Sequence, residues 1–98
     1  MLLAGFYAIV TGASAGIGKY VCRQLLCDFP ELKVIGLSIR EISDIESTNF
    51  GWIKCDVSDA QEVKATFNKI RQDFGEKKCI LLINNVGHAK PVTLLGTF

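Results

Sequence analysis

The sequence predicts an α/β fold in which a parallel sheet carries helices on both faces. Short continuous apolar runs alternate with amphipathic helical patterns along the chain, and an apolar run without polar alternation is typical of a strand buried on both faces. The order strand, helix, strand, short loop, strand, helix, strand favours right-handed crossovers between parallel strands. We therefore expect the spatial strand order 3-2-1-4, with the sheet truncated after the fourth strand.

Length and composition limit the chain to one small folded unit. Its 98 residues are 49% hydrophobic and 21% charged, an ordinary globular composition. The net charge of +1 is too small to predict a nucleic acid or an anionic membrane as a partner. The apolar N-terminus, residues 1–10, lacks a basic region and is shorter than the roughly 20 residues of a membrane-spanning helix.

The four cysteines form no metal-binding pattern. None belongs to a C-x-x-C pair, and the chain has a single histidine, so the spacing excludes a zinc site and we expect no metal. Each cysteine lies in an apolar run, where a small buried thiol is the expected role. Reduced thiols indicate an intracellular protein, and we expect a cytoplasmic one.

The first strand is predicted over residues 6–10, and a glycine-rich turn, residues 11–18, follows it. A helix begins in this turn, because Ile17, Tyr20 and later apolar residues repeat at 3.6-residue spacing. We expect the apolar members of this pattern, Ile17, Tyr20, Val21 and Leu25, on one face that packs in the core. Pro30 ends the helix, since a proline removes a backbone donor and obstructs the preceding turn.

The second and third strands are predicted over residues 32–37 and 50–57. The polar segment between them, residues 40–49, is a loop or at most a turn or two of helix. After the third strand, Ser58 predicts the N-cap of the next helix. Gln61, three residues later, would complete a capping box.

The second helix has one apolar face and ends at Gly75, a residue type that commonly follows helices. Its apolar positions are Val63, Phe67, Ile70 and Phe74. The fourth strand is predicted over residues 79–83, and residues 84–87 end it. Residues 88–98 show no clear period. Trp52, like the phenylalanines, falls within an apolar pattern and is expected in the core.

A glycine-rich turn between a strand and a helix is the most informative feature. Its glycines are Gly12, Gly16 and Gly18. Glycines let a backbone approach an oxyanion closely, and a helix start offers unpaired N–H groups at the positive end of its dipole. Ser14 adds a hydroxyl donor. The pattern predicts a phosphate-binding turn, and a turn that only packs tightly is the alternative.

Two common phosphate-binding patterns do not fit this turn. The P-loop requires G-x-x-x-x-G-K-S/T, but Tyr20 follows Lys19 here and Ala13 replaces the first glycine. The pattern G-x-G-x-x-G fails because Ser14 occupies the position of the second glycine. We therefore set nucleotide-triphosphate hydrolysis aside. What remains is the variant T-G-x-x-x-G-I-G.

Three segments together resemble the short-chain dehydrogenase/reductase family. They are T-G-A-S-A-G-I-G at residues 11–18, C-D-V at residues 55–57 and N-N-V-G at residues 84–87. Each follows a predicted strand, and their order and separations fit the family. The resemblance covers the whole chain but only the front part of the family's fold. It implies that residues 1–98 form part of an NAD(P)-binding Rossmann domain.

The resemblance implies cofactor-binding roles for particular residues. The backbone of the glycine turn would hold the pyrophosphate and the adenosine ribose, a role that falls to Gly12, Ala13, Ser14, Ala15, Gly16, Ile17 and Gly18. Asp56 would accept a hydrogen bond from the adenine amino group, and the Val57 N–H would pair with a ring nitrogen. A turn or helix-capping carboxylate is the alternative for Asp56. Asn85 would lie beside the cofactor ribose, and Gly87 belongs to the same motif.

The end of the second strand predicts the cofactor preference. An acidic side chain there would accept from the ribose 2′-hydroxyl, whereas a basic one would meet a 2′-phosphate. No acid ends this strand, and Arg40 falls where NADP-preferring family members carry a basic residue. An arginine fork suits a phosphate. We predict NADP, with NAD as the alternative, although Glu41 is adjacent and a solvated charge is the other role open to Arg40.

The family's chemistry implies residues that this chain does not contain. Its members transfer a hydride between a nicotinamide and a carbonyl or alcohol, using a Tyr, a Lys four residues later and a Ser. Tyr7 and Tyr20 are the two tyrosines, and Thr11 and Gln24 stand four residues after them. We therefore assign no catalytic residue and expect the Tyr-x-x-x-Lys segment beyond Phe98.

Two classes of function stay open on the sequence. The chain is either the cofactor-binding part of an oxidoreductase acting on a small carbonyl or alcohol substrate, or a non-catalytic dinucleotide-binding or interaction module. A non-functional fragment is a further alternative. The fourth strand would have an open outer edge, which invites association. We expect poor solubility or marginal folding, aggregation through residues 79–83, and homo-oligomers paired along this edge.

Overall fold

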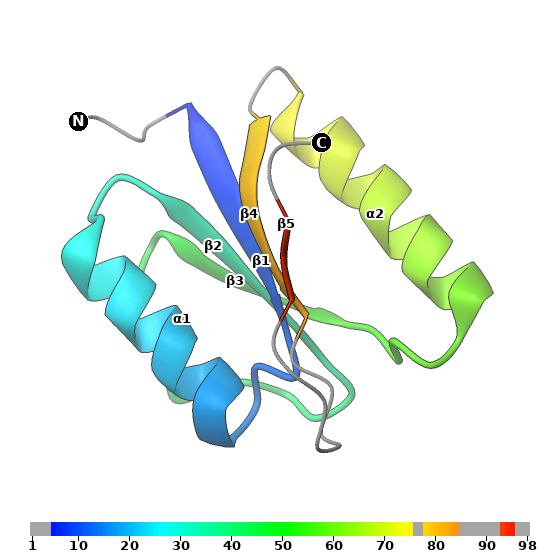
Figure 1. The fold of residues 1–98 in the computed structure, drawn as a ribbon, viewed down its shortest axis with the longest axis horizontal. Coiled ribbons are helices and arrows are strands. Elements are labelled where there is room, and N and C mark those ends of the chain that lie inside the picture. The colour runs from blue at the N-terminus through cyan, green and yellow to red at the C-terminus, as the bar shows by residue number, and fades with distance from the viewer. Residues whose placement is uncertain (1–4, 76–77, 85–92, 96–98) are drawn as a thin grey trace.

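A computed structural model of the chain describes residues 5–75, 78–84 and 93–95. The elements within these residues are β1 (Phe6–Thr11), α1 (Gly16–Asp28), β2 (Lys33–Ser38), β3 (Phe50–Lys54), α2 (Ala60–Phe74), β4 (Lys78–Asn84) and β5 (Thr93–Leu95). They form one sheet of order β3-β2-β1-β4-β5, with α1 and α2 on opposite faces (Figure 1). β1 pairs in parallel with both β2 and β4, and β2 pairs in parallel with β3. The predicted α/β class and the order 3-2-1-4 are confirmed.

β5 is an element that the sequence did not reveal. It pairs antiparallel with β4, and residues 93–95 face residues 82–84 in the register. The predicted open outer edge of the fourth strand is therefore wrong over residues 82–84. Three residues are too few to show a period, and such a strand depends on its partner more than on its own propensity.

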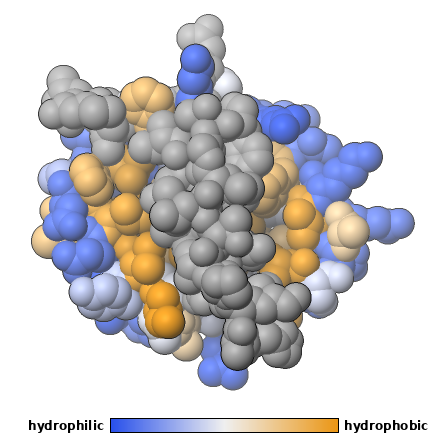
Figure 2. Space-filling view, in the orientation of Figure 1, coloured by the Kyte–Doolittle hydropathy of each residue, from blue (hydrophilic) through white to orange (hydrophobic). Residues whose placement is uncertain are grey.

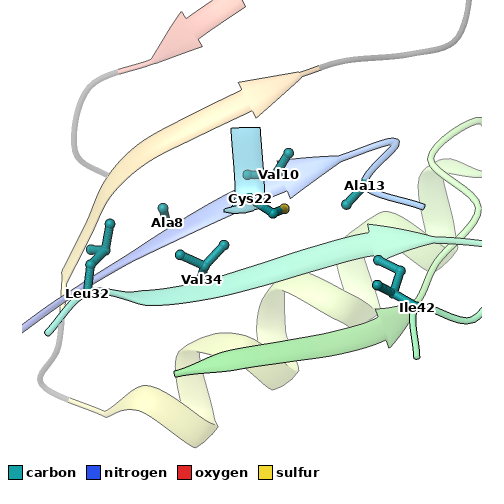
Figure 3. Close-up of a cluster of buried hydrophobic side chains, with 7 residues drawn as sticks. All are labelled: Ala8, Val10, Ala13, Cys22, Leu32, Val34 and Ile42. Carbon is teal, nitrogen blue, oxygen red and sulfur yellow. The ribbon is translucent and has the colours of Figure 1, made fainter. Parts of the chain in front are cut away.

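Alternating side chains of β1 divide the core into two layers. Ala8 and Val10 face α1 and pack in a cluster whose other buried members are Ala13, Cys22, Leu32, Val34 and Ile42 (Figure 3). Tyr7 and Ile9 point the other way, toward α2, and pack with Ile35, Leu37, Cys55, Ile70 and Cys79. This period of two is the geometry of a strand with both faces buried. Figure 2 shows hydrophobic side chains toward the middle of one view and hydrophilic ones along its periphery.

The buried face of α1 differs from the predicted one. Ile17 and Tyr20 are 63% and 65% exposed, whereas Gly18 and Cys22 are the buried residues of this helix. Half-buried Val21, Leu25 and Leu26 pack against the same core cluster. The large apolar residues left toward solvent are those of the first turns of α1. The prediction that Ile17 and Tyr20 belong to the core is therefore wrong.

The prediction of buried thiols is correct for three cysteines and wrong for the fourth. Cys22, Cys55 and Cys79 are buried, but Cys27, near the end of α1, is exposed. Burial raises the pKa of Cys22 to about 12, because an apolar environment disfavours the thiolate. An apolar run around a cysteine in an amphipathic helix does not specify which way its side chain points.

The boundaries of α2 correct the predicted cap. Asp59 is the N-cap, and its side chain accepts hydrogen bonds from the backbone N–H groups of Gln61 and Glu62. Ser58 donates instead to the carboxylate of Asp56. A turn at Asp56 also ends β3 at Lys54, earlier than predicted. The predicted stop is confirmed, since α2 ends at Phe74 and is followed by Gly75 with φ 54°.

The connection between β2 and β3 contains no helix or strand, as predicted. It is nevertheless packed against the fold, because Ile42 is buried in the α1-side cluster. Gly36 of β2 makes room for it, since a Cβ built there would lie 3.1 Å from Ile42 Cδ1 and 3.0 Å from the Ala13 Cβ. Among the residues that the structure describes, no helix is long and apolar enough to cross a membrane.

Candidate functional site

A cleft of about 550 Å³ opens where β1, β2 and β3 end. These strands are parallel, so their carboxyl ends meet at one edge of the sheet. Six residues predicted from the sequence line this cleft: Gly12, Ser14, Ala15, Arg40, Asp56 and Val57. Its other lining residues, to which the sequence assigned no cofactor-binding role, are Leu37, Ser38, Ile39 and Cys55.

The turn between β1 and α1 forms one wall of the cleft. Gly12 and Gly16 adopt φ of 61° and 60°, a conformation that other residues rarely take. The N–H of Ala13 donates to the carbonyl of Leu37 over 3.3 Å, and its side chain is fully buried. Ala13 thus anchors the turn to β2 rather than lining the cleft. Three more predicted residues, Gly16, Ile17 and Gly18, are also absent from the lining.

The two helices begin differently. Ala15, the N-cap of α1, provides no side-chain hydrogen bond, and the first turn of α1 contains no acidic residue. α2 has both features, in Asp59 and Glu62. Backbone N–H groups in the first turn of a helix lack partners within the helix and attract anions. Because no side chain of the described residues caps α1, its first turn, which follows the lining residue Ala15, can offer those N–H groups to an anionic ligand that reaches past the edge of the cleft.

A hydrogen-bonded chain holds the end of β2. The indole Nε1–H of Trp52 donates to Ser38 Oγ over 2.9 Å. The Ser38 hydroxyl donates to the carbonyl oxygen of Arg40 over 2.5 Å, and the Cys55 N–H donates to the Ser38 carbonyl over 3.1 Å. Arg40 is exposed and enters none of the ion pairs among the described residues. Its backbone is therefore held while its guanidinium faces solvent at the cleft.

Asp56 shapes the turn that forms the third wall. Its Oδ1 accepts from the Ser58 hydroxyl over 2.6 Å and from the Ser58 N–H over 3.0 Å. These bonds lower the pKa of Asp56 from its usual value, because they favour the charged carboxylate. The Asp56 N–H donates to Glu62 Oε1 over 2.9 Å. Asp56 therefore has the turn role considered as its alternative, and it also lines the cleft.

An ion-pair cluster ties the loop after β2 to α1. Asp44 Oδ2 lies 2.6 Å from Lys19 Nζ and 3.3 Å from an Arg23 guanidinium nitrogen. The hydrogen bond from Lys19 is the main cause of a lowered pKa at Asp44. Sequence reasoning missed this contact. Its local signal was the spacing of two cations four residues apart on one helix, but nothing marked Asp44 as their partner.

Two of the predicted cofactor-binding residues belong to a segment that the structure does not describe, and neither tyrosine lines the cleft. Asn85 and Gly87 lie outside the described residues. Tyr7 is buried and stacks on Phe74, with ring centroids 4.8 Å apart. Burial is the main cause of a raised pKa at Tyr7. Neither Tyr7 nor the exposed Tyr20 belongs to the cleft lining.

Known proteins resemble this chain in both sequence and fold. The short chain dehydrogenase family matches residues 7–96. The 3-oxoacyl-(acyl-carrier-protein) reductase FabG of Escherichia coli (strain K12) is 36% identical over 92 residues, covering 89% of this chain. Human dehydrogenase/reductase SDR family member 11 is 38% identical over 101 residues, covering 91% of it. A short chain dehydrogenase from Leptospira borgpetersenii, solved with bound NAD⁺, superposes with a TM-score of 0.73 at 28% identity over 87% of the chain.

The three proteins named here are longer than this chain. The chain spans 36% of the length of each of the two relatives and 32% of the Leptospira chain. The matched part is the N-terminal, cofactor-binding region of the family. On the family match over residues 7–96 and the parallel sheet with its cleft, the chain belongs to the short-chain dehydrogenase family.

Proposed function

We propose that the cleft binds the adenosine half of a dinucleotide, with NADP favoured over NAD. In this proposal residues 1–98 are the NAD(P)-binding part of an oxidoreductase. The observation that carries it is one cleft at the ends of three parallel strands, which gathers the glycine turn, Arg40 and Asp56. Open α/β sheets bind ligands at this edge. The volume of about 550 Å³ lies within the range of small-molecule pockets.

The residues present fit a dinucleotide. The pyrophosphate would lie against the turn from Gly12 to Ala15 and the uncapped first turn of α1, where no acidic side chain repels it. Asp56 would face the adenine, because Oδ1 is already occupied by Ser58 and Oδ2 makes no hydrogen bond among the described residues. The backbone of Val57, also in the lining, would complete this contact. Asn85 and Gly87 would serve the nicotinamide half.

The preference for NADP rests on the residues at the end of β2 and just after it, which line the cleft. Ser38 ends this strand, so no carboxylate stands there to accept from a ribose 2′-hydroxyl. Arg40 lines the cleft, and a guanidinium binds a phosphate through charge-assisted hydrogen bonds. NAD remains the alternative cofactor, and it is the one bound by the Leptospira relative.

The complete protein would use this cofactor on a carbonyl or alcohol substrate. When bound, a nicotinamide accepts or gives a hydride. The proton must then move through a group outside this cleft, since Tyr7 is buried against Phe74 and Tyr20 is outside the lining. We propose that a Tyr-x-x-x-Lys segment of the complete protein supplies it. The part of that work assigned to these 98 residues is to bind and orient the cofactor.

Titration of the chain with NADPH and NADH tests this proposal. Cofactor fluorescence gives each Kd, and thermal unfolding shows whether binding stabilises the fold. We expect tighter binding of NADPH. Arg40→Ala should weaken NADPH binding about 10-fold or more while changing NADH little, because a hydrogen bond to a charged group contributes about 1.5–3 kcal/mol.

Arg71→Ala is the matched control, because it removes the same charge from the last turn of α2, outside the cleft lining. It should leave both affinities unchanged. A folded wild-type chain that binds neither cofactor would contradict dinucleotide binding. Tighter binding of NADH would contradict the role of Arg40 and leave NAD as the cofactor.

A further inference from the structure

We propose that Trp52 is a positioning residue for cofactor preference, acting through Ser38 on the backbone of Arg40. This inference rests on the proposed function and goes beyond it, because Trp52 lies on β3 and does not line the cleft. Two hydrogen bonds carry it. The indole Nε1–H donates to Ser38 Oγ over 2.9 Å, and the Ser38 hydroxyl donates to the Arg40 carbonyl over 2.5 Å.

The indole fixes the direction of this chain. An indole N–H can only donate, so Ser38 Oγ must accept from Trp52. A hydroxyl has one hydrogen, and with the indole on its acceptor side that hydrogen is directed to the Arg40 carbonyl. Without the indole, the hydroxyl would be free to turn toward other acceptors. Trp52 therefore holds the two-residue step between the end of β2 and Arg40 in one conformation.

The geometry of the sheet makes this contact rigid. Trp52 pairs with Gly36 in the parallel register, and Ser38 stands two residues further along β2. Ser38 is 7% exposed, and its carbonyl also accepts from the Cys55 N–H. Both ends of the contact thus belong to paired strands. A short side-chain contact between two paired strands can transmit a positional constraint to the loop that follows.

A fixed Arg40 backbone matters for a 2′-phosphate more than for a 2′-hydroxyl. An arginine side chain loses conformational freedom when it binds a phosphate. A backbone that is already fixed at Arg40 lowers the total entropic cost of that binding. NADH lacks the 2′-phosphate that the guanidinium would bind, so the affinity for NADH should not depend on the position of Arg40. The result is a predicted effect on the ratio of the two affinities. Simple loss of packing around Trp52 would lower both affinities together.

Trp52→Phe tests the inference, because it keeps an aromatic ring and removes the donor. We expect the Kd for NADPH to rise about 3- to 10-fold, the range given by one net hydrogen bond, and the Kd for NADH to change less than about 2-fold. Ser38→Ala, which removes the middle of the chain, should give the same shift and serves where Trp52→Phe folds poorly. Leu32→Val is the packing control, since this buried residue precedes the start of β2 and does not line the cleft.

A double-mutant cycle separates positioning from structure. In an Arg40→Ala background, Trp52→Phe should no longer change the affinity ratio, because the residue that it positions is gone. Equal weakening of NADPH and NADH by Trp52→Phe would overturn the inference while leaving the proposed function standing. A ratio shift that persists without Arg40 would overturn it as well. A wild-type chain that binds neither cofactor would overturn the proposed function and this inference with it.

Discussion

Gly36→Ala should destabilise the fold, because β2 passes close to three neighbours at this residue. A Cβ built on Gly36 would lie 2.9 Å from Phe50 Cζ, 3.0 Å from the Ala13 Cβ and 3.1 Å from Ile42 Cδ1. The Phe50 and Ile42 atoms are ends of side chains that can rotate away. The Ala13 Cβ cannot, since its backbone is bonded to Leu37, so the glycine turn must shift.

The magnitude follows from two opposing terms. Overpacking a filled core costs about 1–3 kcal/mol, whereas replacing a glycine in an unstrained conformation gains about 0.4–1 kcal/mol by restricting the unfolded chain. The net expectation is a loss of about 1–2 kcal/mol in the free energy of unfolding. In a chain of this size, that loss corresponds to a fall of roughly 4–16 °C in Tm.

Urea unfolding of Gly36→Ala and Gly51→Ala provides the assay. Gly51 lies on β3, where it pairs with Ile35 beside Gly36, and a Cβ built there meets nothing within 4 Å. Gly51→Ala should therefore be neutral or slightly stabilising. A midpoint for Gly36→Ala that equals or exceeds that of Gly51→Ala would refute the reasoning. Because Ala13 precedes the cleft residue Ser14, Gly36→Ala should also weaken cofactor binding.

Three further predictions concern the N-cap of α2, the stability of the fold at acidic pH and the reactivity of the cysteines. Asp59→Ala should lower the free energy of unfolding by about 1 kcal/mol, since it removes the N-cap of α2; equal stability in urea would contradict this. The pKa of Asp44 is lowered mainly by the hydrogen bond from Lys19. The ionised Asp44 therefore stabilises the fold fully at pH values above 3.8, the usual pKa of the group, and this stabilisation is lost as the pH falls through the lower pKa of the folded state. Asp44→Asn should reduce the pH dependence of the free energy of unfolding in this acidic range. An unchanged pH dependence would contradict a stabilising ion pair at Asp44. A thiol reagent at about pH 8 should label exposed Cys27 first. Cys22, with its pKa raised to about 12, should react only on unfolding. Mass spectrometry of the wild type and of Cys27→Ser measures the labelling, and rapid labelling of folded Cys27→Ser at Cys22 would contradict the prediction.

The strand order could be predicted from the sequence, but the face of α1 could be predicted only in part. Continuous apolar runs and glycine-rich strand ends specify a parallel sheet, because few topologies satisfy both. The fully buried residues of α1 are Gly18 and Cys22, which are small and do not dominate a hydropathy pattern. Ile17 and Tyr20 dominate that pattern although both are exposed. Hydropathy therefore identified the helix and the packing of Val21 and Leu25, but it misplaced Ile17 and Tyr20.

The walls of the cleft were predictable where they follow strand ends, and the contacts that hold them were not. Arg40 and Asp56 each stand just after a strand, which is a local signal. The contact of Trp52 with Ser38 depends on the register between β2 and β3, a long-range property. The choice between Ser58 and Asp59 as N-cap has the same origin. Both residue types cap helices, and the bond of Ser58 to Asp56 decides between them.

The loop after β2 is the part of the cleft whose rigidity least resembles its sequence. Its polar composition indicates a mobile connection, yet contacts with the rest of the fold hold it, three of them close to Arg40. Ser38 and Trp52 hold its start, Ile42 is buried in the core, and Asp44 is paired with two cations of α1. Each fastening comes from a different part of the fold: β3, the core and the first helix. The position of Arg40 is consequently a property of the whole sheet edge, and replacing Arg40 alone would remove its charge while the backbone around it stays in place.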